Sequence, residues 1–112
     1  MAEFDKEAMR RFEDRTVAHV RTYFRDECSA MDKAEVRQHV REGMGRANHH
    51  GITGEFDVVR FIDLMFALSI DFDTSPDTPW AAPILADPDL DATTKMDRLY
   101  ERAEQEEAPA EA

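Results

Sequence analysis

Residues 57–68 limit the possible folds of this chain more than any other stretch. Three charged side chains, Asp57, Arg60 and Asp63, are spaced three residues apart, and every other position is apolar. That spacing, kept over this length, favours a helix of about residues 54–69 over a strand. Because only a narrow stripe of this helix is polar, other elements must cover most of its surface. We therefore predict an all-α fold with this helix as its buried centre.

Two amphipathic segments precede this central helix. Apolar residues recur at intervals close to multiples of three and four over residues 4–28, which predicts a first helix. Asp32 is a suitable N-cap for a second helix, and Glu35 stands where it would complete a capping box. Gly51 is suited to the C-cap of that helix.

Gly43 and Gly45 lie in the interior of the second predicted helix. Each glycine weakens a helix by up to about 1 kcal/mol relative to alanine. We expect both to be there because they allow another helix to approach closely.

The part of the chain after the central helix begins with a loop. Residues 71–80 are rich in Asp, Pro, Ser and Thr, the composition of successive turns. Thr78 as N-cap and Pro79 at the first helical position predict a short helix that runs through Leu85. A last amphipathic helix is expected at about residues 92–106.

The length of 112 residues is enough for one core. We expect a single helical domain at residues 1–105, built as a compact bundle of four to five helices around the central one. Residues 106–112 are expected to form a frayed acidic tail.

Charge is distributed unevenly along the chain. The net charge is −11, and residues 51–112 hold fifteen acidic against four basic residues. Six aspartates and no Lys or Arg occur between Asp71 and Asp91. Such a segment repels a phosphate backbone, so we expect no direct binding to nucleic acid.

Cysteine content and hydropathy indicate the compartment. Cys28 is the only cysteine, so no intramolecular disulfide can form, and the disulfide framework of a small secreted protein is missing. No apolar run approaches the roughly 20 residues of a membrane span. We expect a cytoplasmic protein that is not inserted in a membrane.

Two features of the sequence have a superficial likeness to metal sites. Asp71 and Asp73 match the first acidic positions of a calcium-binding loop. Pro76, however, occupies the position where the sharp turn needs Gly, and Ala82 occupies the position of the bidentate Glu. His49 and His50 are adjacent, and neighbours on a helix point about 100° apart. We predict that the histidines are surface or capping residues, that the aspartates cap turns, and that the protein has no metal, cofactor or catalytic residue.

The acidic segment also contains apolar side chains that could anchor a partner. Acidic residues around them would steer a basic protein surface towards the anchors. Burial is the favoured interpretation for Trp80, which is flanked by prolines, and an exposed anchor is the alternative. The candidate partner-binding residues are Asp71, Asp73, Asp77, Trp80, Ile84, Leu85 and Asp87.

Several motifs carry a resemblance to a known group of proteins. They are residues 51–66, the Asp71-Phe-Asp73 triplet and the Pro79–Leu85 segment, supported by residues 41–47 and 95–100. Over about residues 12–103, the chain resembles small bacterial proteins of unknown activity that are encoded beside type VI secretion components, such as PAAR-like spike proteins and their effectors. The resemblance implies such a genomic neighbourhood but no mechanism, and it supports the hypothesis of a partner from a secretion system.

Three hypotheses for the function follow. The first is a non-enzymatic accessory or adaptor protein, with a chaperone-like or immunity-like role, that binds a larger secretion-system or effector protein. The second is an acidic inhibitor that mimics nucleic acid, which requires the aspartates to lie in phosphate-like rows. The third is a metal-dependent enzyme that uses the Asp71–Asp77 loop with a histidine, which requires a pocket.

Overall fold

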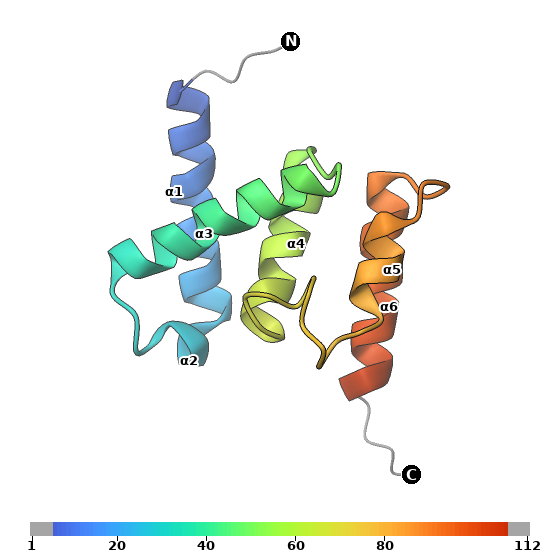
Figure 1. The fold of residues 1–112 in the computed structure, drawn as a ribbon. Coiled ribbons are helices and arrows are strands. Elements are labelled where there is room, and N and C mark those ends of the chain that lie inside the picture. Colours follow the sequence, from blue (N-terminus) through green and yellow to red (C-terminus); the bar gives the residue numbers. More distant parts are fainter. Residues whose placement is uncertain (1–5, 108–112) are drawn as a thin grey trace.

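The computed structural model describes residues 6–107, and every regular secondary-structure element in that range is a helix. Its six helices are α1 (Lys6–Tyr23), α2 (Arg25–Cys28), α3 (Lys33–His49), α4 (Glu55–Ala67), α5 (Ala81–Ala86) and α6 (Ala92–Glu107) (Figure 1). The predicted all-α bundle is confirmed, although it has six helices and not four to five. Glu107 still belongs to α6, so the first part of the expected tail is helical. The predicted helix start at residue 4 and residues 108–112 lie outside the described residues.

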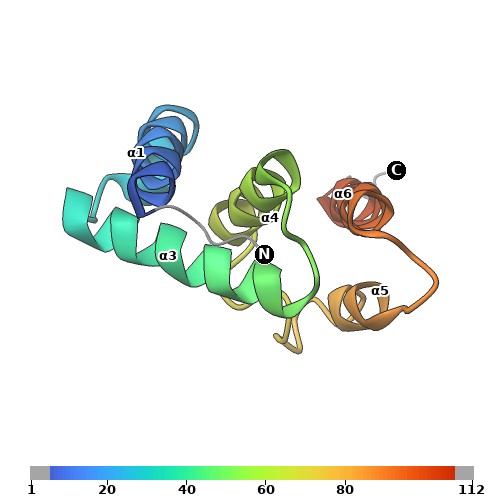
Figure 2. The same cartoon turned by 90° about the horizontal axis from the view of Figure 1, so that it is seen from above.

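The helices form two layers. Seen from above, α1, α4 and α6 lie in one layer, and α3 and α5 lie in the other (Figure 2). The thinnest extent of the molecule is 20 Å, which corresponds to two helix diameters. Helix α3 crosses both α1 and α4, so it closes the core from one side (Figure 1).

Helix α4 is the centre of the bundle, as its sequence predicts. It packs against α1, α3 and α6, and the side chains of Phe61 and Ile62 are fully buried. Its charged stripe is bound to the neighbouring helices. Asp57 accepts a hydrogen bond from Thr93 Oγ1 of α6 at 2.7 Å, and Asp63 lies 2.9 Å from His19 Nε2 of α1.

The second predicted helix, α3, has the N-terminal cap that its sequence indicates, and its C-cap is His50, one residue before the predicted Gly51. The side chain of Asp32 accepts a hydrogen bond from the backbone N–H of Glu35 at 2.8 Å, and Glu35 Oε1 accepts one from the backbone N–H of Asp32 at 2.9 Å. This capping box is confirmed. Gly51 follows the helix with φ at +80°, a left-handed conformation that glycine adopts without steric cost.

The two glycines inside α3 differ in their surroundings. A Cβ on Gly43 would lie 2.6 Å from Cγ1 of Ile62 and 2.8 Å from Sδ of Met65, so this glycine does allow α4 to approach. A Cβ on Gly45 would meet nothing within 4 Å. The expectation of a close approach is confirmed for Gly43 and wrong for Gly45, which lies on the open side of the helix.

Alanine substitutions at these glycines should therefore have opposite effects. Gly45→Ala should raise the free energy of unfolding by about 0.5–1 kcal/mol, because it adds helix propensity without a clash. Gly43→Ala should lower it by about 1–3 kcal/mol, because the added methyl group overpacks the contact with α4. Urea denaturation of the two variants beside the wild type measures both. Equal shifts of the same sign would contradict the packing described here.

The first predicted helix is interrupted. Phe24, with φ −124° and ψ 52°, separates α1 from α2, although 4–28 is predicted as one helix. Tertiary packing explains the break, because the Phe24 ring lies 5.9 Å from that of Phe66 and Cys28 is buried beyond it.

The short helix after the loop begins later than predicted. Helix α5 starts at Ala81, and neither Thr78 nor Pro79 belongs to it. The Thr78 hydroxyl donates to the backbone carbonyl of Phe72 at 2.6 Å, so it holds the loop together and does not cap the helix. The backbone N–H of Ala81 donates to the carbonyl of Thr78 at 3.1 Å.

Candidate functional site

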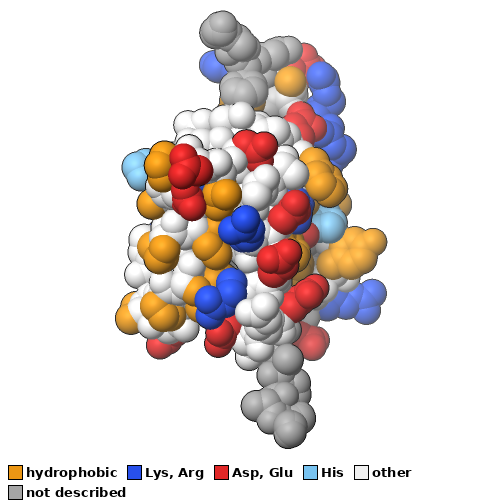
Figure 3. Space-filling model, turned by 90° about the vertical axis from the view of Figure 1, so that its right-hand side faces the viewer, with side chains coloured by type: hydrophobic (Ala, Val, Ile, Leu, Met, Phe, Trp, Pro, Cys, Tyr) orange, Lys and Arg blue, Asp and Glu red, His pale blue; other side chains and the backbone are white. Residues whose placement is uncertain are grey.

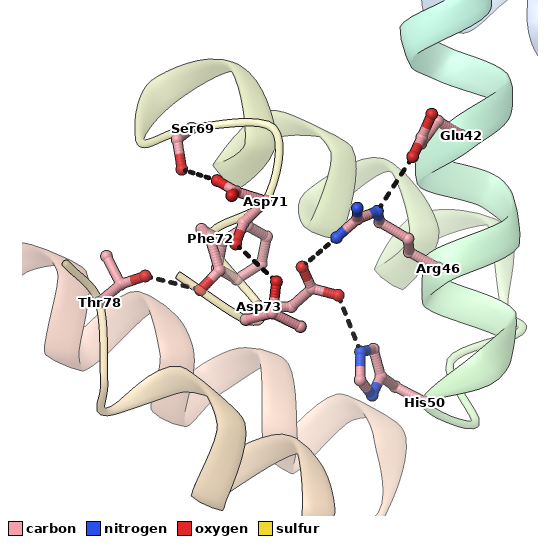
Figure 4. A network of polar contacts seen from close by, with 9 residues as sticks. Glu42, Arg46, His50, Ser69, Asp71, Phe72, Asp73 and Thr78 are labelled. Atoms are coloured by element: carbon pink, nitrogen blue, oxygen red, sulfur yellow. Dashed lines mark hydrogen bonds and ion pairs between the residues drawn. The ribbon is translucent and has the colours of Figure 1, made fainter. Parts of the chain in front are cut away.

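The acidic segment is anchored to α3 by one of its aspartates. Asp73 is only 4% exposed, and its carboxylate binds the Arg46 guanidinium and accepts a hydrogen bond from His50 Nε2 at 3.0 Å (Figure 4). Arg46 also reaches Glu42, 3.4 Å away on α3. The loop and α3 are thus joined by a line of alternating charges.

Asp87 and Asp91 cap local structure, whereas Asp71 and Asp73, for which turn capping was predicted, bind other side chains. Asp87 Oδ1 accepts a hydrogen bond from the backbone N–H of Asp89 at 2.9 Å, which stabilises a turn. Asp91 Oδ1 accepts one from the backbone N–H of Thr94 at 2.8 Å at the start of α6. That hydrogen bond lowers the pKa of Asp91 from its ordinary value. Asp71 accepts a hydrogen bond from the Ser69 hydroxyl at 3.0 Å.

The proposed anchors of the acidic segment are mostly buried in the domain itself. Trp80 is 9% exposed, which confirms its favoured interpretation, and Leu85 is 2% exposed. Ile84 is half-buried. Asp73, Trp80 and Leu85 therefore contribute to the core and not to a free surface, which corrects their assignment as partner-binding residues.

The rest of the candidate set remains at the surface. Asp71 and Asp77 are exposed, and Asp87 is half-buried. Figure 3 shows apolar side chains gathered on the left, over α5, where Ala82 and Pro83 are exposed. Small side chains predominate there, and the large anchors expected among them point inward.

The histidines and the loop do not form a metal site in the described part of the chain. His50 does meet Asp73, but Arg46 binds the same carboxylate. His49 is exposed and packs edge-on against His50, with 5.2 Å between the ring centroids. Over residues 6–107, no group of three His, Cys, Asp or Glu side chains is arranged to hold a metal ion.

Burial disfavours the ionised form of two potential nucleophiles. Burial raises the pKa of the Cys28 thiol, whose Sγ lies 3.8 Å from the backbone oxygen of Val20. Burial also raises the pKa of Tyr100 to about 12, and its hydroxyl donates to the backbone oxygen of Arg60 at 3.0 Å. Neither group is poised to ionise at neutral pH.

An apolar groove lies between α1 and α3, far from the acidic segment in sequence. Its volume is about 630 Å³. We name it the α1–α3 groove. It is lined by Ala8, Met9, Phe12 and Glu13 of α1, by Arg41, Met44, Gly45 and Asn48 of α3, by Ile52 and Thr53, and by Glu55 and Val58 of α4.

The shape of this groove follows from how the helices cross. The first turns of α1 extend past α3 (Figure 1), so within residues 6–107 no helix lies opposite them at this end. Phe12, Ile52 and Val58 are buried and form the floor. Met9, 36% exposed, and the half-buried Met44 line the sides.

The charged groups at the edge of the groove are paired with other charged side chains. Glu13 is buried and accepts hydrogen bonds from Arg41 Nε at 3.0 Å and from Arg37 at 3.0 Å. Glu55 accepts a hydrogen bond from Arg15 at 3.0 Å. Hydrogen bonds with Asp14 and then Glu13 raise the pKa of Arg37 above its ordinary value. These ion pairs lie along the edge of the groove.

Comparison with protein-family models, curated proteins and solved structures found no match for this chain. None of the helices within residues 6–107 is both long and apolar enough to cross a membrane.

Sequence reasoning missed the α1–α3 groove. Met9, Phe12 and Met44 have the spacing of a core stripe, but only Phe12 is buried, and the exposure of Met9 and Met44 depends on which helix lies opposite. The sequence held no clear signal for the groove, because only the structure shows that Gly45, beside Met44, faces open space and not another helix.

Proposed function

We propose that this protein is a non-enzymatic accessory or adaptor protein, with a chaperone-like or immunity-like role, that holds a helical segment of a larger protein in the α1–α3 groove. The observation that carries the proposal is a groove of about 630 Å³ in a chain of 112 residues, lined by two methionines and floored by apolar side chains. Flexible, polarisable methionines are typical of surfaces that accept the apolar face of an amphipathic helix.

The polar groups favour a protein segment over a small molecule. A small-ligand pocket presents a few convergent polar groups that orient its ligand. Here the Glu13 carboxylate is bound by Arg37 and Arg41, and the Glu55 carboxylate is bound by Arg15. An apolar helix face requires no such groups, because its own backbone hydrogen bonds are satisfied.

We also propose that the larger protein is a spike or effector component of a bacterial secretion system, and that the complex forms in the cytoplasm. This part rests on the resemblance of residues 12–103 to proteins encoded beside type VI secretion components. Identification of the partner protein therefore tests this part of the proposal.

Site-specific crosslinking in the native host tests the proposal. A photoreactive benzoylphenylalanine in place of Met44 should give one discrete adduct with a larger protein, because residue 44 lines the groove. The same group at the exposed Gln105, near the end of α6, should give none. Adding Gly45→Leu should reduce the adduct about tenfold, because a side chain then fills the groove.

Four results would contradict parts of the proposal. Equal adducts from residues 44 and 105, or no adduct from residue 44, would remove the groove as a binding site. An adduct with a protein outside any secretion system would remove only the secretion assignment. Turnover of a small molecule by the purified protein would remove the non-enzymatic role.

A further inference from the structure

A second hollow continues the α1–α3 groove towards the beginning of α3. Its volume is about 430 Å³, and it shares Met9, Glu13 and Arg41 with the groove. We name it the basic hollow. Its further lining residues are Lys6, Arg10, Asp14 and Arg37, so four basic side chains face two acidic ones.

The basic hollow keeps positive charge available at the surface. Lys6 and Arg10 are exposed, and neither forms an ion pair with another described residue. Arg41 binds Glu13, yet its side chain remains 58% exposed. The chain has a net charge of −11, so the local excess of positive charge beside this apolar groove is opposite in sign to the charge of the whole chain.

We infer that the segment bound in the α1–α3 groove is an amphipathic helix whose apolar face is flanked by carboxylates that pair with Lys6 and Arg10. The inference rests on the proposed function and adds the chemistry of the partner. A helix whose apolar residues recur at i, i+3, i+4 and i+7 places its flanking residues along the edges of the groove that holds it. At one end of the α1–α3 groove, that edge is the basic hollow.

The expected role of these charges is selection. Ion pairs at an exposed edge add little affinity, but they favour partners of complementary charge and disfavour the opposite charge. The chain as a whole attracts cationic peptides through its net charge. A preference for an acidic peptide would therefore have to come from the local charge of the basic hollow.

Two synthetic peptides test the inference. Each has about 18 residues, roughly five helical turns, with the same leucine face, and the flanking positions are Glu in one and Lys in the other. Titration by fluorescence anisotropy should give saturable binding of the Glu peptide and about tenfold weaker binding of the Lys peptide. The double variant Lys6→Glu/Arg10→Glu should reverse this preference.

A matched control separates local charge from net charge. Lys33→Glu/Arg98→Glu changes the net charge by the same amount at exposed positions outside the groove and the hollow. It should leave the preference for the Glu peptide in place. Gly45→Leu should weaken both peptides, and circular dichroism should show that every variant keeps its helices.

The outcomes distinguish the two proposals. The inference is overturned if the Glu peptide does not bind saturably, if the Lys peptide binds as well or better, or if the control double variant has the same effect as Lys6→Glu/Arg10→Glu. If both peptides bind equally and Gly45→Leu weakens both, the groove stands and only the charge inference fails. If Gly45→Leu changes neither affinity, the proposed groove fails as well.

Discussion

Replacing Phe61 with alanine should lower the free energy of unfolding by about 3–5 kcal/mol, a large part of the stability of a domain of this size. The Phe61 side chain is fully buried on α4, with 5.0 Å between its ring centroid and that of Phe72 and 6.0 Å to that of His50. Its removal leaves a cavity where α3, α4 and the loop meet, and the rigid helices around it can collapse only in part. Thermal or urea denaturation followed by circular dichroism measures the loss.

Phe56 provides a matched control on the same helix. It is 75% exposed, and its ring lies 5.6 Å from the Arg60 guanidinium. Phe56→Ala should cost at most about 1 kcal/mol, the value of an exposed cation–π contact. A cooperative Phe61→Ala transition with an almost unchanged midpoint, or equal losses for the two variants, would show that α4 is not the centre of the core.

Asp73→Asn should lower the free energy of unfolding by about 2–3 kcal/mol. The carboxylate of Asp73 is buried and bound by Arg46 and His50, and the substitution leaves these two donors with a neutral amide in place of the negative charge. Arg46 is 28% exposed and keeps Glu42 as a partner, which limits the loss. Urea denaturation near neutral pH measures the change.

The control for this variant is Asp71→Asn, two residues earlier in the same loop. Asp71 is exposed and accepts a hydrogen bond from Ser69, so its replacement should cost less than about 0.5 kcal/mol. Equal small losses for both variants would mean that Asp73 is solvated and free for a partner, as its sequence context first predicts. A larger loss of unfolding free energy for Asp73→Asn than for Asp71→Asn would show that the Asp73 carboxylate holds the loop against α3.

Local interactions made much of the fold predictable. The capping box of Asp32 and Glu35 and the left-handed Gly51 depend on residues at most a few positions apart, so their spacing in the chain is sufficient. The central position of α4 was also predictable from the spacing of its charged residues, because a helix with so narrow a polar stripe must be covered by other elements. The capping roles of Asp87 and Asp91 followed from the same local chemistry.

The errors and omissions concern contacts between segments distant in the chain. The break at Phe24 accompanies a contact with Phe66, and the burial of Asp73 depends on Arg46 and His50 of another helix. Thr78 suits a helix N-cap by composition, but its hydroxyl is used by the carbonyl of Phe72. A spacing pattern identifies the apolar side of a helix, but not what lies opposite.

The α1–α3 groove shows the same division between local pattern and tertiary arrangement. Met9, Phe12 and Met44 are marked as apolar positions by their spacing, and that much is a property of the sequence alone. Phe12 lies in the floor of the groove and Met9 lines its side because α1 extends beyond α3 at this end. Helical period specifies the direction of a side chain around its own axis, whereas the crossing of two helices decides whether that direction leads into a core or an open groove.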